Sequence, residues 1–335
     1  MYLFVPANPK ELTDRASWFK KPVARELIRK KDVQFGFELK GDSKNIKIEP
    51  PLSWGYHLPN GFSAEWHYHP EKRSKLLNDF QSVAALKPMY INLHGPKLWW
   101  KPKTHEYVRR YFNRSEPEEY FKVLGSAVIL INELEKIFPN LTIENTLLCD
   151  YYRDEDNFLP MTSYQLNIGT LDDLFYLRQK TGVEILLDIE HLFLTMNFLH
   201  RKKNYRDLPI EKIEKMTEDE KKLKSIFGFY LRPGLIPYAD EKVNFASFFR
   251  KVKAQKYHLT GSTQDIARKK DVTHGPIEKD DQTFRKNLRL VLKQNPEVLL
   301  IETANRGINS CYYYLLPNET ELSFYNLCQI LLEEL

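Results

Sequence analysis

Carboxylate and imidazole side chains stand at the ends of several apolar runs in this sequence. The run 183–189, VEILLDI, ends with Asp188 and Ile189, and His191 follows shortly after. Neutral imidazoles and carboxylates bind divalent zinc, manganese or iron without thiols. We therefore take Asp188 and His191 as candidate metal ligands. The other candidates of the same kind are His57, His94, Glu144, His258, His274 and Glu302.

Each of these residues also has an ordinary structural interpretation. A single histidine at a strand end is more often a hydrogen-bonded core residue, and a single acid there often caps the next helix. Four positions taken together favour metal binding, namely Glu144, Asp188, His258 and Glu302. The remaining four histidines suit either further ions or substrate binding and proton transfer. Our catalytic candidates are Glu144, Glu302 and His191, while we expect His67, His69, His105 and His200 to be peripheral.

These side chains can meet only if their runs are neighbouring strands of one sheet. Short apolar runs alternate with segments of helical periodicity, which is typical of βα units. The predicted strands are 33–39, 52–58, 89–95, 140–146, 183–189, 256–262, 297–303 and 310–316. The predicted helices are 70–86, 116–138, 170–181, 190–200, 281–294 and 319–335.

Eight strands without a glycine-rich nucleotide-binding turn favour a closed (β/α)8 TIM barrel of the α/β class. We predict one such domain over residues 1–335, in which the carboxyl ends of the strands converge on one mouth. Two segments, 97–120 and 201–250, are longer than a βα unit needs, and we expect both to lie over one barrel face.

The two predicted insertions differ in character. The segment 97–120 places Trp99 and Trp100 beside Lys101 and Lys103. Such side chains stack on bases and meet phosphates, or pack as a lid, and the sequence leaves both interpretations open. The alternating charges of 201–250 are typical of an exposed helix.

The composition excludes some classes of protein but does not identify a binding partner. The formal net charge is +5 in 335 residues, which permits an anionic partner without requiring one. The three cysteines, Cys149, Cys311 and Cys328, have no CxxC spacing, which disfavours a disulfide framework and a cysteine-rich zinc site. A basic leader and an uninterrupted apolar segment of about 18 residues are both missing, so we expect a cytoplasmic protein without membrane association.

The order of the motifs GYHLP, INLHGP, IENT, LLDIEHL, YHLTGS, THGPI and LLIET resembles that of the xylose isomerase-like TIM barrels. Among them it most resembles the endonuclease IV type of apurinic/apyrimidinic endonuclease, over residues 50–305. The resemblance implies zinc, with two or three ions. His57 and His94 would hold one ion, with Glu144 as a bridge. Glu144, Asp188, His258 and Glu302 would surround a second, and His191 with His274 would hold a third.

One ligand departs from the pattern of that family. An aspartate is expected two residues before His274, but Val272 stands there. Either one of three nearby acids, Asp271, Asp280 or Asp281, replaces it, or the site holds only two ions.

The resemblance implies a metal-dependent phosphodiester hydrolase acting on DNA. The alternative within the same superfamily is a sugar isomerase or epimerase with one manganese or similar ion, in which Glu144 and Glu302 exchange a proton with a carbon next to a carbonyl. The additional trio His57, His94 and His274 favours the hydrolase, whereas Val272 and the modest net charge favour the isomerase. A catalytically inert binding barrel ranks below both, because unpaired buried acids are costly. We place the hydrolase first.

Overall fold

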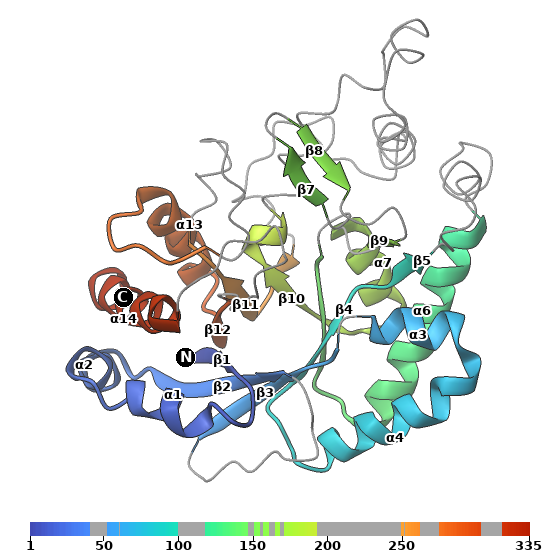
Figure 1. The fold of residues 1–335 in the computed structure, drawn as a ribbon, viewed down its shortest axis with the longest axis horizontal. Coiled ribbons are helices and arrows are strands. Elements are labelled where there is room, and N and C mark those ends of the chain that lie inside the picture. The colour runs from blue at the N-terminus through green and yellow to red at the C-terminus, as the bar shows by residue number, and fades with distance from the viewer. Residues whose placement is uncertain are drawn as a thin grey trace, which may run out of the picture.

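The centre of the molecule is a closed barrel of parallel strands (Figure 1). The computed structural model describes residues 1–40, 52–59, 61–99, 118–146, 151–154, 157–160, 165–167, 171–192, 249–250, 252–261, 275–302 and 317–335. The strand order is β1-β12-β11-β10-β6-β4-β3-β2. These strands are β1 (Tyr2–Ala7), β2 (Gln34–Lys40), β3 (Ser53–His57), β4 (Ile91–His94), β6 (Leu141–Glu144), β10 (Glu184–Asp188), β11 (Lys256–Leu259) and β12 (Val298–Ile301). The predicted α/β class and TIM barrel are confirmed, and the single domain over 1–335 stays a prediction.

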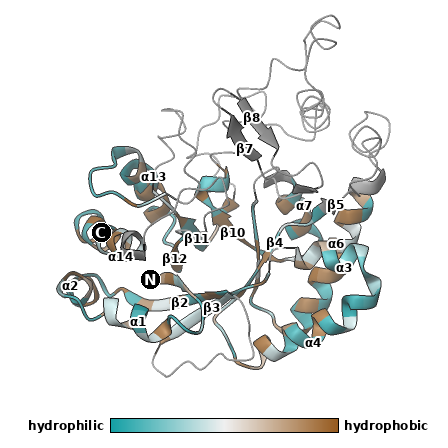
Figure 2. Ribbon diagram, in the orientation of Figure 1, coloured by the Kyte–Doolittle hydropathy of each residue, from teal (hydrophilic) through white to brown (hydrophobic). Residues whose placement is uncertain are grey.

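Helices surround the barrel and separate its strands along the chain. They are α1 (Leu12–Trp18), α2 (Pro22–Lys31), α3 (Phe62–Tyr68), the 3-10 helix η2 (Pro70–Lys72), α4 (Arg73–Ala84), α6 (Glu118–Ile137), α7 (Leu171–Thr181), α13 (Gln282–Leu292) and α14 (Pro317–Glu334). Figure 2 shows hydrophobic and hydrophilic residues side by side on helices such as α4 and α6, as expected for helices with one buried face. The last helix, α14, packs against α2 near the start of the chain. Among the described residues, no helix has the length and apolar character needed to cross a membrane.

The strand that completes the barrel is β1 at the start of the chain. It pairs in parallel with β2 on one side and with β12 on the other. The sequence pattern pointed instead to 310–316 as the eighth strand, and that run lies outside the described residues. The run Tyr2–Ala7 contains Pro6, which cannot donate a hydrogen bond to a neighbouring strand, so the sequence does not mark it as a barrel strand.

The barrel interior changes from apolar to polar along the strands. One end is filled by a buried cluster of Phe4, Tyr90, Leu186, Val298 and Leu300. Buried polar side chains occupy the positions nearer the carboxyl ends, namely Glu38, Asn92, Thr142, Glu144, Asp188 and His258. Since side chains alternate along a strand, the residues between them, such as Ile143, join the separate core under the helices. The polar layer is therefore the floor of the barrel mouth.

The close fit of Tyr90 inside the barrel depends on a glycine. A Cβ atom added to Gly55 of β3 would lie 2.4 Å from Cζ of the Tyr90 ring. This distance is far below van der Waals contact, so only glycine lets the ring occupy its place.

The connections at the mouth carry small additional sheets. Strand β5 (Lys97–Trp99) pairs antiparallel with β9 (Gln165–Asn167), and β7 (Tyr151–Asp154) pairs antiparallel with β8 (Asn157–Pro160). Three of these strands belong to the connection between β6 and α7, a third long segment that the sequence analysis did not single out. Most of the two predicted insertions, including Trp100, Lys101 and Lys103, lies outside the described residues.

Candidate metal centre

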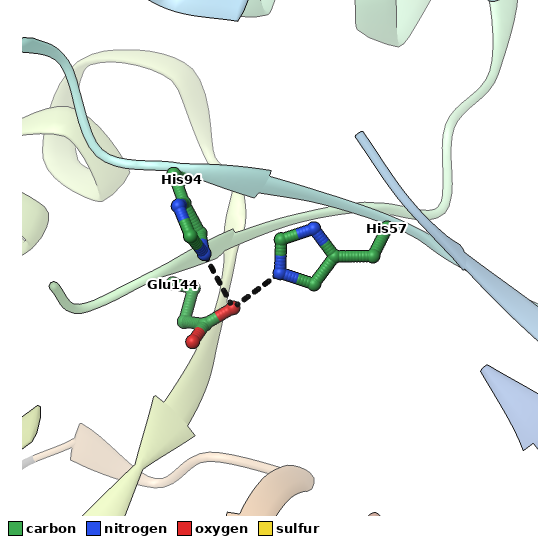
Figure 3. Close-up of side chains that lie close together, drawn as sticks. All are labelled: His57, His94 and Glu144. Carbon is green, nitrogen blue, oxygen red and sulfur yellow. Dashed lines mark ion pairs between the residues drawn. The ribbon is translucent and has the colours of Figure 1, made fainter. Parts of the chain in front are cut away.

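Six of the predicted residues come together at the carboxyl ends of the barrel strands. Their ligand atoms form two groups, within each of which the atoms lie within 4.8 Å of one another. The first group, drawn in Figure 3, is His57, His94 and Glu144. The second group is Glu144, Asp188, His258 and Glu302. Glu144 belongs to both groups. The roles of these residues as ligands and catalytic groups stay predictions.

Strand register explains why residues far apart in sequence meet here. His94 of β4 lies opposite Glu144 of β6, and Asp188 of β10 lies opposite His258 of β11. Register partners on adjacent parallel strands point to the same face of the sheet. Both pairs therefore face the barrel interior at the level of the mouth.

Glu144 presents one oxygen to each group. Its Oε2 lies 3.2 Å from Nε2 of His57 and 3.5 Å from Nε2 of His94, and Figure 3 shows both contacts ending on this oxygen. Its Oε1 lies 3.2 Å from Nδ1 of His258. Burial raises the pKa of the Glu144 carboxyl, but the surrounding histidines, His258 first, hold it well below its usual range. The result is an ionised carboxylate in a bridging position, and the amide of Asn92 donates a hydrogen bond to it.

The two histidines of the first group both turn Nε2 toward Glu144. Nδ1 of His57 donates to the carbonyl oxygen of Leu58 at 2.8 Å, which fixes the orientation of the ring. Burial lowers the pKa of His94 to about 4, and the neighbouring His57 and Lys97 add to this effect against the attraction of Glu144. An unprotonated imidazole is the form that binds a metal ion.

Asp188 has two separate tasks, one for each carboxylate oxygen. Its Oδ1 accepts a hydrogen bond at 2.7 Å from the backbone N–H of His191, where the chain turns into a helical segment at 189–192. Its other oxygen, Oδ2, faces His258 and lies 3.9 Å from Nδ1 of that residue. The side chain of Asn145 bonds to both the N–H and the C=O of Asp188 and so fixes this part of β10. The capping and metal-binding interpretations are therefore compatible.

The donor atoms of the second group fit a divalent cation. Within the described part of the chain, Glu144 Oε1, Asp188 Oδ2 and His258 Nδ1 are buried and make no hydrogen bond. Uncompensated buried polar atoms are costly, and a metal ion compensates several of them at once. Burial raises the pKa of Asp188 to about 8, and the nearby carboxylates Glu302 and Glu144 add to the rise. A cation bound between these carboxylates would reduce the repulsion among them.

His191 lies beside the second group without belonging to either. Its Nδ1 is 3.0 Å from the carbonyl oxygen of Asn145 and 3.5 Å from both Glu144 Oε1 and Asp188 Oδ2. Burial lowers its pKa, but the attraction of Asp188, Glu144 and Glu302 outweighs burial and raises the value to about 10.

The proposed third site cannot be traced in the described residues. His274, Asp271 and Val272 all lie outside them. Of the two other substitutes for the expected acid, Asp280 is exposed, and Asp281 accepts hydrogen bonds from the N–H groups of Thr283 and Phe284 as the N-cap of α13.

The histidines expected to be peripheral are placed only in part. His67 and His69 lie at and just after the end of α3, and neither belongs to a metal-capable group among the described residues. Nδ1 of His69 lies 3.1 Å from a carboxylate oxygen of the exposed Glu71. His105 and His200 lie outside the described residues.

Sequence reasoning missed two charged residues of the site, both on β2. Glu38 is fully buried, and its Oε2 lies 3.2 Å from Nε2 of His258. The ammonium group of Lys40 donates to Oε1 of Glu302 at 2.6 Å. Gly36, Glu38 and Lys40 alternate with Phe35, Phe37 and Leu39 along the strand. This period of two was the available signal, because it marks Glu38 and Lys40 as pointing into the barrel.

Comparison with known proteins gives information on the fold alone. No family model and no curated protein matches the sequence. The chain is similar to a 3-keto-D-glucoside 4-epimerase from E. coli, with 12% identity, a TM-score of 0.51 and coverage of 98% of each chain. An L-ribulose 3-epimerase matches with 9% identity and a TM-score of 0.50, over 98% of this chain and 94% of that one.

Endonuclease IV from Thermus thermophilus also matches, at 12% identity over 100% of this chain and 99% of that one. Its TM-score of 0.47 is too low to support an argument. Together with the closed eight-stranded barrel, the matches with the two epimerases show that the chain has a TIM-barrel fold.

Proposed function

We propose that the chain is a phosphodiester hydrolase with a multinuclear divalent-metal centre. The observation that carries the proposal is the position of Glu144, which presents one carboxylate oxygen to each of two donor groups. An enzyme that uses a single ion needs only the second group. The first group, with the buried His57 and the half-buried His94, supports a second ion close to the first.

Each ion would be held by one of the two donor groups. His57, His94 and Glu144 would hold one, while Asp188, His258 and Glu302 with Glu144 would hold the other. Neighbouring divalent ions supply Lewis-acid stabilisation for the attacking and leaving oxygens of a phosphodiester. Zinc is the proposed metal, because imidazole and carboxylate donors suit it.

Lys40 supports an anionic substrate. Burial lowers the pKa of its ammonium group, but Glu302, Glu38 and Glu144 outweigh burial and raise it above its usual value. Lys40 therefore stays charged beside Glu302 at the rim of the site, with 39% of its side chain exposed. A phosphate oxygen is a suitable partner for a fixed ammonium in this place. We propose DNA that carries an abasic site as the substrate.

A sugar epimerase is the second candidate, and one observation favours it. The second group is complete by itself, with two glutamates flanking an aspartate and a histidine. In that case Glu144 and Glu302 would remove and return the proton of a carbon next to a carbonyl. The two matched structures reported above with TM-scores of 0.51 and 0.50 are both named as epimerases.

The deciding experiment offers both substrates to the same zinc-loaded protein. Duplex DNA with one abasic site should be cut, cutting should stop with a chelator, and added zinc should restore it. Glu302→Gln should reduce cutting strongly because the second group loses a ligand. Glu278→Gln, which makes the same change at an exposed position, should cut normally.

The same protein is then incubated with ketoses in deuterated water. A hydrolase leaves the carbon-bound protons of these sugars unexchanged. Uncut DNA together with deuterium uptake next to the carbonyl, with either zinc or manganese, would overturn the proposal in favour of the epimerase.

A further inference from the structure

A buried carboxylate that neither donor group uses lies directly behind His258. Glu38 of β2 has no exposed surface. Its Oε2 accepts a hydrogen bond from the Tyr90 hydroxyl at 2.8 Å and lies 3.2 Å from Nε2 of His258. Glu38 is therefore a carboxylate enclosed in the barrel interior, in contact with both Tyr90 and His258.

The two nitrogens of His258 face different partners. Nδ1 lies 2.7 Å from Oε2 of Glu302 and 3.2 Å from Oε1 of Glu144, which are donors of the second group. Nε2 faces Glu38 instead. A carboxylate at Nε2 favours a hydrogen on that nitrogen, so that a cation bound among the donors of the second group would take the place of the Nδ1 proton and use the Nδ1 lone pair. That lone pair is what a metal ion in the second group would need.

Tyr90 holds Glu38 in its turn. The tyrosine is fully buried, and its ring fills the space that the missing side chain of Gly55 leaves open. Its position is therefore set by packing, and its hydroxyl donates to the same oxygen that His258 approaches. Tyr90, Glu38 and His258 thus form one connected row across the barrel interior.

We propose that Glu38, held by Tyr90, is a positioning residue that fixes the ring of His258 and thereby raises the metal affinity of the second group alone. The inference rests on the metal centre of the proposed function but not on its reaction. Outer carboxylates of this kind orient a ligating imidazole and increase its basicity. In the first group, by contrast, Nδ1 of His57 donates to a backbone carbonyl oxygen.

The experiment measures zinc affinity by competition with a chelator of known affinity. Glu38→Gln is made in the wild-type chain and in His94→Ala, where the first group is disabled and only the second remains intact. We expect zinc binding to weaken by about 10- to 100-fold in the His94→Ala chain. In the wild-type chain we expect one ion to weaken by the same factor and the other to be unchanged.

A matched variant tests the row without changing a charge. Tyr90→Phe keeps the ring and removes only the hydroxyl, so it should weaken the same ion by a smaller factor. Unchanged zinc affinity in Glu38→Gln, or equal weakening of both ions, would overturn the inference. If Glu38→Gln does not fold, Tyr90→Phe decides, and unchanged affinity there overturns it as well.

These outcomes are separate from those of the proposed function. If DNA is not cut but Glu38→Gln weakens one ion selectively, the hydrolase fails and the positioning role stands. If DNA is cut and Glu38→Gln binds both ions normally, the hydrolase stands and the positioning role fails.

Discussion

Glu144 is the residue on which the metal centre depends, because both donor groups include it. Glutamine at this position keeps the size of the side chain but replaces one oxygen with an N–H donor that repels a cation. Glu144→Gln should therefore lose both ions, whereas Glu302→Gln should lose only the ion of the second group. Elemental analysis of the purified variants measures this, and circular dichroism checks that the barrel is intact. Equal metal content in both variants and the wild type would exclude these groups as the binding sites.

The buried acids also predict that zinc binding depends on pH. In the metal-free protein, burial and the neighbouring acids Glu302 and Glu144 raise the pKa of the Asp188 carboxyl, so protons compete with a metal ion for it. The acids around His191 raise the pKa of its imidazole as well. Zinc affinity should therefore increase as the pH rises from about 6 to 8. Calorimetry in two buffers of different ionisation enthalpy should also show proton release on binding, and its absence would contradict this protonation pattern.

At the scale of the element, strand ends were the part of the fold that sequence predicted well. A buried parallel strand is a short apolar run, and the first polar residue after it marks the mouth. His57, His94, Glu144 and Asp188 each end a strand, as expected. Glu38 escaped this reasoning because it lies inside a strand and not at its end. The period of two along β2 indicates that Glu38 points into the barrel, but its contact with His258 of β11 is visible only in the closed barrel.

The strands outside the barrel could not be predicted in the same way. β5, β7, β8 and β9 have three or four residues each, which is too short for a period of two to be recognised. The pairing of β5 with β9 also depends on contact between distant parts of the chain, whereas β7 and β8 are only two residues apart in sequence. Atomic contacts such as the cap formed by Asp188 are likewise visible only in the structure.

One prediction about the barrel itself concerns the packing of Tyr90. Gly55→Ala should destabilise the metal-free protein by about 1–3 kcal/mol, because the new methyl group would overlap the ring. Urea unfolding measures the change. Gly125→Ala in α6 is the control, since a Cβ there meets no atom within 4 Å, and it should be neutral or stabilise by up to about 1 kcal/mol. Equal stability of the two variants would show that the Tyr90 ring can move aside, and would contradict the prediction.

At the scale of the whole molecule, the small positive net charge leaves DNA binding to local features. The basic and aromatic segment around Trp100, Lys101 and Lys103 is the proposed contact, although it lies outside the described residues. If these lysines meet phosphates, DNA binding should weaken as salt increases, and replacing both Lys101 and Lys103 with alanine should reduce that dependence. Binding measured at several salt concentrations tests this. An unchanged salt slope in the double variant would place the contact elsewhere.

The central claim is that Glu144 joins two metal-binding groups in one centre. The most direct test is the number of zinc ions per chain in wild-type protein and in His94→Ala, both prepared without chelator and measured by elemental analysis. The two groups predict at least two ions in the wild type and one fewer in His94→Ala, with the other ion retained. A single ion per chain that His94→Ala does not affect would contradict the account.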